Sequence, residues 1–177
     1  MNALRRFVAA NAVLLVAVGV LASCGDTPKG PNDADRVFVG AMVPHHVLGI
    51  ELIDDAVPRV DDVRLRRLVF KMSAYHDSEL HDLEKRVKDW GVVSPQQFPG
   101  WIDPAKIDAM SRLSGTDYDV RWLDLMIEHH EGAVTLADVE ASEGANDDLR
   151  SLARRIADAQ RDEIAKMREL RGSLVAG

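Results

Sequence analysis

Apolar residues recur at helical spacing along most of the chain, beginning after residue 32. In the first stretch, steps of three and four residues connect Phe38, Met42, His45, Gly49, Leu52 and Ala56. This spacing places the side chains on one face of a helix, as in the seam of a helical bundle. Asn32 or Asp33 can cap the start of this helix, and Pro58 forces its end just beyond Ala56.

The same criterion predicts three further long helices. The second runs from about Asp61 to Trp90 and stops at Gly91. The third begins at a Thr116 cap and is broken at Gly144, and Asn146 caps the fourth. No stretch alternates with period two for long enough to indicate a strand, so the chain is predicted to be all-α.

The stretch between the second and third helices, residues 92–115, has a different character. Ser94-Pro95 and Asp103-Pro104 each have the form of a cap followed by a proline in the first helical turn. One or two short helices are therefore expected in a long crossover connection.

The chain repeats one pattern at an offset of 84 residues. Met42-Val43-Pro44-His45-His46 returns as Met126-Ile127-Glu128-His129-His130. The register continues without a gap through the pairs Asp35 and Asp119, Phe38 and Trp122, Leu52 and Leu136, Leu65 and Leu149, and Glu79 and Glu163. Two copies of one helical hairpin, residues 33–91 and 116–173, are therefore predicted to form one four-helix bundle domain over residues 33–173, with pseudo-twofold symmetry.

The repeated cluster points to metal binding. In each copy the Met and the first His lie on one side of a helix, and the second His lies about 100° further round. Counting residues from the two hairpin turns places His76, Gln160, Glu79 and Glu163 at the same depth. Buried polar groups of this kind need partners or a ligand. The candidate metal residues are Met42, His45, His46, His76, Met126, His129 and His130.

Thioether and imidazole together favour copper, because methionine is a soft donor that prefers the cuprous ion. Zinc would be expected to use more histidine, thiolate or carboxylate. A di-iron centre in a bundle usually takes two glutamates and two Glu-x-x-His motifs, which this chain lacks. The structural alternative is that the methionines fill the core and the histidines are only hydrogen-bonded.

The N-terminal segment, residues 1–23, predicts export. Two arginines precede an apolar run that is too short for a comfortable membrane span. Leu21-Ala22-Ser23-Cys24 resembles the lipobox of bacterial lipoproteins, in which the cysteine carries lipid. Residues 24–32 then form a flexible tether. The expected location is the extracytoplasmic face of the cell membrane, with membrane lipid as a partner through Cys24.

The net charge of the exported chain argues against nucleic acid as a partner. Removing residues 1–23 leaves 154 residues, with 20 basic against 29 acidic side chains once Arg5 and Arg6 are lost. The resulting net charge of −9 makes nucleic acid a poor partner, because phosphate binding needs a basic surface.

The quoted motifs resemble the domain of unknown function 305 family. Its members carry Met-Ile-x-His-His-x-Gly-Ala, which residues 126–133 match in full, and residues 160–167 resemble its closing Gln-x-x-Glu-Ile-x-x-Met. The resemblance runs from about Asp33 to Leu170. It implies a ferritin-like four-helix fold and, for some members, extracytoplasmic copper binding and resistance. Leu48-Gly49 departs from the Gly-Ala of the family, and the few methionines argue against high-capacity copper storage more than against a single site.

Two hypotheses of different class follow. The first is a lipid-anchored bundle that binds copper, or another transition metal, as a chaperone, buffer or resistance factor without turnover. The second is an accessory lipoprotein that docks on a membrane protein complex, with structural histidines. A metal oxidase or other redox enzyme is disfavoured, because no carboxylate-rich di-metal set or nucleophile triad is visible in the sequence.

Overall fold

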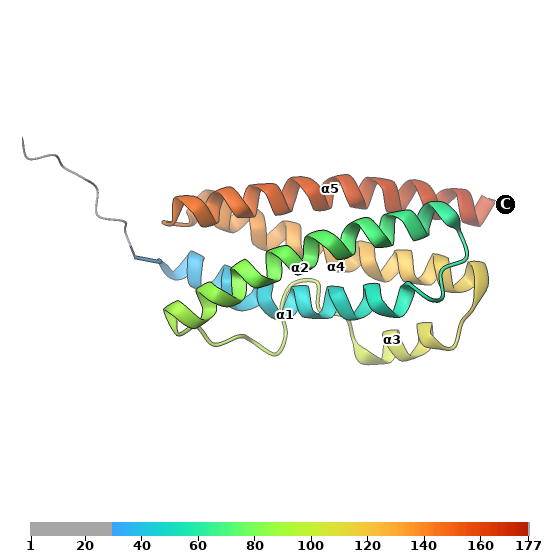
Figure 1. The fold of residues 1–177 in the computed structure, drawn as a ribbon, viewed down its shortest axis with the longest axis horizontal. Coiled ribbons are helices and arrows are strands. Elements are labelled where there is room, and N and C mark those ends of the chain that lie inside the picture. Colours follow the sequence, from blue (N-terminus) through green and yellow to red (C-terminus); the bar gives the residue numbers. More distant parts are fainter. Residues whose placement is uncertain (1–29, 177) are drawn as a thin grey trace, which may run out of the picture.

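The computed structural model describes residues 30–176, which contain five helices and the segments that connect them (Figure 1). The long helices are α1 (Asp33–Ala56), α2 (Val63–Trp90), α4 (Gly115–Glu143) and α5 (Asp147–Ala176), and the short helix α3 spans Pro104–Ser111. No strand occurs among these residues, so the all-α prediction is confirmed. The predicted signal segment, Cys24 and most of the tether lie outside the described residues.

Capping residues set most helix ends where the sequence predicts them. Asn32 and Asp35 form a reciprocal capping box at the start of α1. The amide of Leu149 donates to Asn146 Oδ1 (2.9 Å) at the start of α5. Gly91 ends α2 in the left-handed conformation, with φ of 62°, which a residue with a Cβ rarely adopts.

One short helix, α3, is present in the crossover as predicted, but two of the predicted helix caps are wrong. No helix follows Ser94-Pro95: residues 92–103 form a non-helical segment that packs over the bundle, and α3 starts only after the Asp103 cap. Thr116 does not cap α4. Ser114 occupies the N-cap position without a side-chain hydrogen bond, and Gly115 supplies the positive φ of 59° that the turn into the helix requires.

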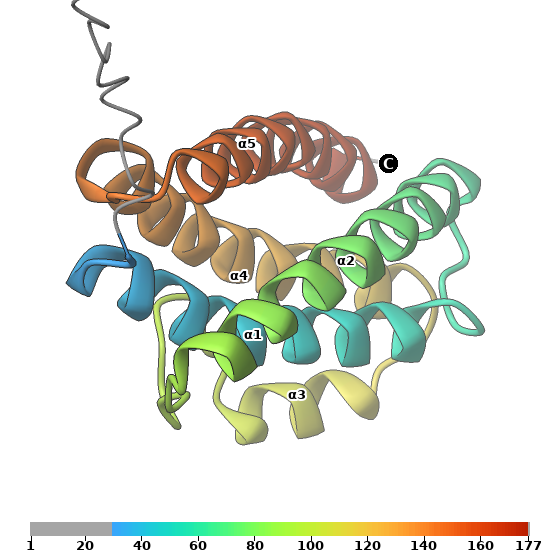
Figure 2. The ribbon, with the colours of Figure 1, turned by 60° about the vertical axis from the view of Figure 1, so that its left-hand side comes forward.

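The two hairpins, α1–α2 and α4–α5, pack together as a four-helix bundle, and α3 lies at the edge farthest from α5 (Figures 1 and 2). The start of α1 and the end of α5 lie at opposite ends of the bundle (Figure 1). Trp122 and Tyr118 are fully buried, and Trp122 Nε1 donates to the carbonyl of Leu52 (2.9 Å), which joins α4 to α1. Among the described helices, α1 is long and apolar enough to cross a membrane, but it serves here as a core helix of the bundle.

Candidate metal centre

Five imidazole rings form a closed circuit at mid-bundle. His45 of α1 and His129 of α4 stack with ring centroids 3.7 Å apart and planes at 20°. The remaining neighbours are tilted pairs: His45 and His46 at 6.0 Å, His46 and His76 at 5.1 Å, His76 and His130 at 5.7 Å, and His129 and His130 at 6.1 Å. The two histidine pairs are arranged alike, as the 84-residue repeat requires.

All seven predicted residues are buried. Met42 and Met126 are fully buried one helical turn before His45 and His129, and therefore lie on the same faces of α1 and α4. His46 and His130 were predicted to flank the seam, yet both have no exposed surface because α2 and α5 cover them. Met72 of α2 is also fully buried one turn before His76, and the sequence reasoning did not include it among the candidate ligands.

In four of the five rings, hydrogen bonds determine which nitrogen carries the proton. His45 Nε2 donates to the carbonyl of His129 (3.0 Å), and His129 Nδ1 donates to the carbonyl of Gly100 (2.8 Å). His76 Nδ1 donates to the carbonyl of Met72 (3.0 Å), and His130 Nε2 donates to Glu163 (3.1 Å). The other nitrogen of each ring is buried without a protein partner: His45 Nδ1, His76 Nε2, His129 Nε2 and His130 Nδ1. Each is thus positioned to present a lone pair.

The fifth ring differs. His46 Nδ1 contacts the carbonyl of Met42 (3.1 Å) and His46 Nε2 contacts Glu79 (2.9 Å), so both of its nitrogens are occupied. Glu79 and Glu163 occupy equivalent positions in the repeat, one against each second histidine. A carboxylate behind an imidazole is the usual outer partner of a metal-binding histidine, because it fixes the tautomer and the ring orientation.

Three of the buried rings, those of His45, His76 and His129, are held in the neutral form. Burial lowers the pKa of His45 and of His76 well below the ordinary value, and repulsion from neighbouring histidines adds to this effect. Burial likewise lowers the pKa of His129 to about 3. At neutral pH these three imidazoles therefore offer lone pairs rather than protons, which is the state that a metal ion requires.

Two glycines leave room around the rings. A Cβ at Gly49 would lie 3.0 Å from His129 Nε2 and 3.3 Å from His76 Nε2, so the two unpartnered nitrogens face the same small space beside α1. A Cβ at Gly132 would collide with the backbone of Pro99 and Gly100. Gly132 therefore lets the crossover segment pass close to α4, where the carbonyl of Gly100 meets His129.

The donor set fits a soft ion better than a hard one. Among residues 30–176, no three His, Cys, Asp or Glu side chains are arranged to hold a metal ion. Four buried nitrogens nevertheless lack partners, beside helix faces that carry three buried methionines. Imidazole with thioether suits copper, particularly Cu(I), whereas zinc makes little use of methionine. The glutamates near the motifs that face outward, Glu128 and Glu131, form ion pairs with Lys106 and Arg168.

The model of the domain of unknown function DUF305 matches residues 84–171, which include α4 and most of α5. A predicted secreted DUF305 protein from Streptomyces coelicolor is 26% identical, with a TM-score of 0.71 over 78% of this chain and 94% of that one. This chain belongs to the DUF305 family. The resemblance inferred from the repeated motifs is thereby confirmed.

Other DUF305 structures share the fold. A DUF305 fragment from Deinococcus radiodurans has a TM-score of 0.72 at 24% identity, over 80% of this chain and 97% of that one. CopM in the Cu(I)-bound form has a TM-score of 0.69 at 21% identity, over 78% of this chain and 96% of that one. CopM has also been solved in Cu(II)-bound and silver-bound forms. No curated protein is significantly similar to this DUF305 chain in sequence.

Proposed function

We propose that this DUF305 protein binds copper, as Cu(I), at the buried imidazole–methionine centre and acts as a copper chaperone, buffer or resistance factor outside the cytoplasm. One observation carries the proposal: four buried imidazole nitrogens have lone pairs and no protein partner. A buried polar atom without a partner costs roughly 1–3 kcal/mol, and four of them in one centre are hard to explain unless a ligand offsets that cost.

The groups of the centre divide into metal ligands and the acceptors that orient them. His76 Nε2 and His129 Nε2, which face the space beside Gly49, are the first candidate ligands. His45 Nδ1, His130 Nδ1 and the thioethers of Met42 and Met126 complete the donor set. The carbonyls and Glu163, which accept from the opposite nitrogens, hold the rings in the metal-binding tautomer.

The solved forms of CopM support the proposal, since a protein with this fold has been crystallised with Cu(I), Cu(II) and silver; imidazole suits copper, and soft thioether donors favour Cu(I). The predicted secreted relative supports an extracytoplasmic location, and the lipobox-like Leu21-Ala22-Ser23-Cys24 is the feature that favours a lipid anchor there. No turnover is proposed.

Competition titration against a chromophoric Cu(I) chelator under reducing conditions tests the proposal, with zinc titrated in parallel. The parent protein should bind Cu(I) far more tightly than zinc, and replacing both Met42 and Met126 by leucine should weaken Cu(I) binding selectively. Leucine preserves the side-chain volume, so the fold should persist. Zinc binding that exceeds Cu(I) binding, or Cu(I) binding indifferent to both substitutions, would refute the copper assignment.

A further inference from the structure

The buried centre meets the surface through the carboxylate of Glu79. The side chain of Glu79 is 19% exposed, whereas that of His46, to which it is hydrogen-bonded, is 0% exposed. On its outer side, Glu79 lines a groove between α2 and α5 with a volume of about 480 Å³, together with Tyr75, Ser78, His81, Asp82 and Arg155. We call this the Glu79 groove. It is a surface depression lined by a residue that is hydrogen-bonded to one of the five rings.

The repeat supplies a built-in comparison. The position of Glu79 corresponds to that of Glu163, which makes the same bond to His130 but has a side chain only 6% exposed. At the 84-residue offset, His81 corresponds to Ala165 and Asp82 to Lys166. Arg155 corresponds to Lys71, so that both sides carry a cation at this position. The two sides of the centre are therefore related by the repeat but differ in the groups that could attract or hold a cation.

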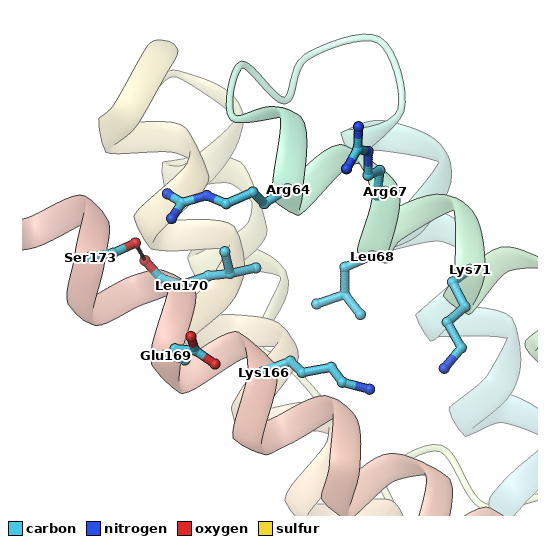
Figure 3. A pocket seen from close by; sticks show the side chains of 8 residues that line it. All are labelled: Arg64, Arg67, Leu68, Lys71, Lys166, Glu169, Leu170 and Ser173. Carbon is cyan, nitrogen blue, oxygen red and sulfur yellow. Dashed lines mark hydrogen bonds between the residues drawn. The ribbon is translucent and has the colours of Figure 1, made fainter.

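The groove that contains Lys71 and Lys166, the repeat counterparts of Arg155 and Asp82, is basic. It is lined by four cations, Arg64, Arg67, Lys71 and Lys166, against the single carboxylate of Glu169, around an apolar floor. Lys71 and Lys166 extend from facing helices towards the space between α2 and α5, and Leu68 and Leu170 point into it (Figure 3). A metal cation is repelled from such a surface. The Glu79 groove instead carries two carboxylates and an exposed histidine against one guanidinium.

We infer that the Glu79 groove is the entrance through which a copper ion reaches the buried centre, with exposed His81 and Asp82 meeting the ion first and Glu79 passing it inward. This inference rests on the proposed function and adds the route by which the ion enters the centre. Behind Glu79, the ring of His46 lies 5.1 Å from that of His76, whose Nε2 is one of the unpartnered atoms. The inward path therefore leads from a carboxylate to an available imidazole. Asp82, with a side chain 55% exposed, lies 3.9 Å from Arg86, so this ion pair is long and screened by solvent.

Uptake kinetics test the entrance separately from the site. The rate at which the protein removes Cu(I) from a weak chromophoric chelator is measured by stopped flow, and the equilibrium affinity is measured on the same samples. His81→Ala and Asp82→Lys should each slow uptake about tenfold, because they remove the first ligand or reverse the local charge. Equilibrium stoichiometry and affinity should stay at the parent values. Raising the ionic strength should reduce the deficit of Asp82→Lys, since salt screens exposed charges.

The other side of the repeat provides the matched control. Lys166→Asp makes the charge change opposite to Asp82→Lys at the equivalent position and should leave the uptake rate within about twofold of the parent. Parent-like rates in both His81→Ala and Asp82→Lys would reject the entrance while leaving the metal centre intact. A strong acceleration by Lys166→Asp would also reject it, because it would place entry on the basic side. A parent protein that takes up no Cu(I) would reject the proposed function and the entrance together.

Silver provides a readout that does not depend on transfer from a chelator. Ag(I) is added stepwise to the isotopically labelled protein, and the imidazole signals are followed by NMR. The signals of the buried rings should change in slow exchange until the centre is filled, and further silver should then shift the His81 signals in fast exchange. His81 signals that remain unmoved throughout a titration that perturbs the buried rings would contradict the entrance.

Discussion

Asp35 and Asp119 each accept backbone hydrogen bonds from the interhelical turn of the opposite hairpin. Asp35 accepts from the amides of Ala145 (3.2 Å) and Asn146 (3.1 Å). Asp119 accepts from Asp61 (3.3 Å) and Asp62 (2.9 Å), which lie at the equivalent positions of the first repeat. Both carboxylates are buried. Each hairpin thus supplies one aspartate that binds the interhelical turn of the other hairpin, and these equivalent pairs of hydrogen bonds join the hairpins at both ends of the bundle.

Asp119→Ala should lower the free energy of unfolding by about 2 kcal/mol, because two turn amides lose a buried, charged acceptor. Urea denaturation monitored by far-UV circular dichroism measures the change. Asp117→Ala, at an exposed position in the first turn of the same helix, is the control and should lower stability by less than about 1 kcal/mol, the contribution of an acidic side chain to the helix dipole. Equal effects of the two substitutions would show that the reciprocal bonds do not contribute.

Glu140 makes the stability of the Asp35 end of the bundle depend on pH. It is buried near Asp35, no hydrogen-bond donor reaches either of its oxygens, and its counterpart in the first repeat is Ala56. Burial, and then the neighbouring Asp35, raises the pKa of Glu140 from 4.5 to about 8, although Arg150 and Arg86 act in the opposite direction. Between these two pH values the folded state holds a proton that the unfolded state releases.

The contribution of Glu140 to stability is therefore complete below its unfolded pKa and is lost as the pH rises to about 8. Glu140→Gln removes this loss and should raise stability at pH 8 by about 2 kcal/mol, with little change at pH 4.5. Denaturation curves at several pH values test this expectation. Glu143→Gln, at an exposed position nearby, should leave the pH profile of the parent unchanged.

His45→Ala and His129→Ala should each weaken Cu(I) binding by at least about tenfold, and the double variant should lose little more than either single one. Residues that share one site are non-additive, and these two rings stack at 3.7 Å. Competition titration of all four proteins provides the measurement. Losses that simply add would indicate two independent sites.

Metal should also raise the melting temperature of the parent by mass action, by an increment equivalent to about 4 kcal/mol at a thousandfold excess over the dissociation constant. That increment should be absent in both single variants. Equal melting temperatures for the metal-free and metal-loaded parent would leave the histidines with a structural role alone.

Gly132→Ala should destabilise the protein by about 2 kcal/mol or more and displace the crossover segment, because the new Cβ collides with the Pro99–Gly100 backbone. The signal of the His129 Nδ1 proton in NMR should shift or broaden as its bond to Gly100 is lost. Gly172→Ala is the control, since nothing lies within 4 Å of its Cβ position in α5, and it should be neutral or slightly stabilising. A wild-type-like Gly132→Ala protein would contradict the close approach.

Cys24→Ala should release the protein from the membrane fraction or leave an unprocessed precursor, because Leu21-Ala22-Ser23-Cys24 resembles a lipobox. Fractionation followed by mass determination of the N-terminus measures both outcomes. Processed Cys24→Ala protein that still fractionates with membranes would show that lipid on this cysteine is not the anchor.

Helical periodicity and capping residues were sufficient to predict the four long helices, because each carries a continuous apolar seam between clear start and stop signals. The repeat offset and residue counts from the turns also predicted that His76 would meet the two clusters. The path of residues 92–103 was not predictable, since an irregular segment has no periodicity and its position depends on the space left by Gly132. The full burial of His46 and His130 was missed because it depends on how closely α2 and α5 cover them.

The difference between His81 and Ala165, and between Asp82 and Lys166, follows from joining the two hairpins in one chain. A homodimer of a single hairpin would be obliged to place the same residue at both positions, since one gene would encode both subunits. Within one polypeptide, each half of the bundle is free to diverge while the symmetric interior, with its paired histidines and glutamates, is retained. Covalent linkage thereby allows two surfaces that the repeat makes equivalent to carry different side chains and different charge.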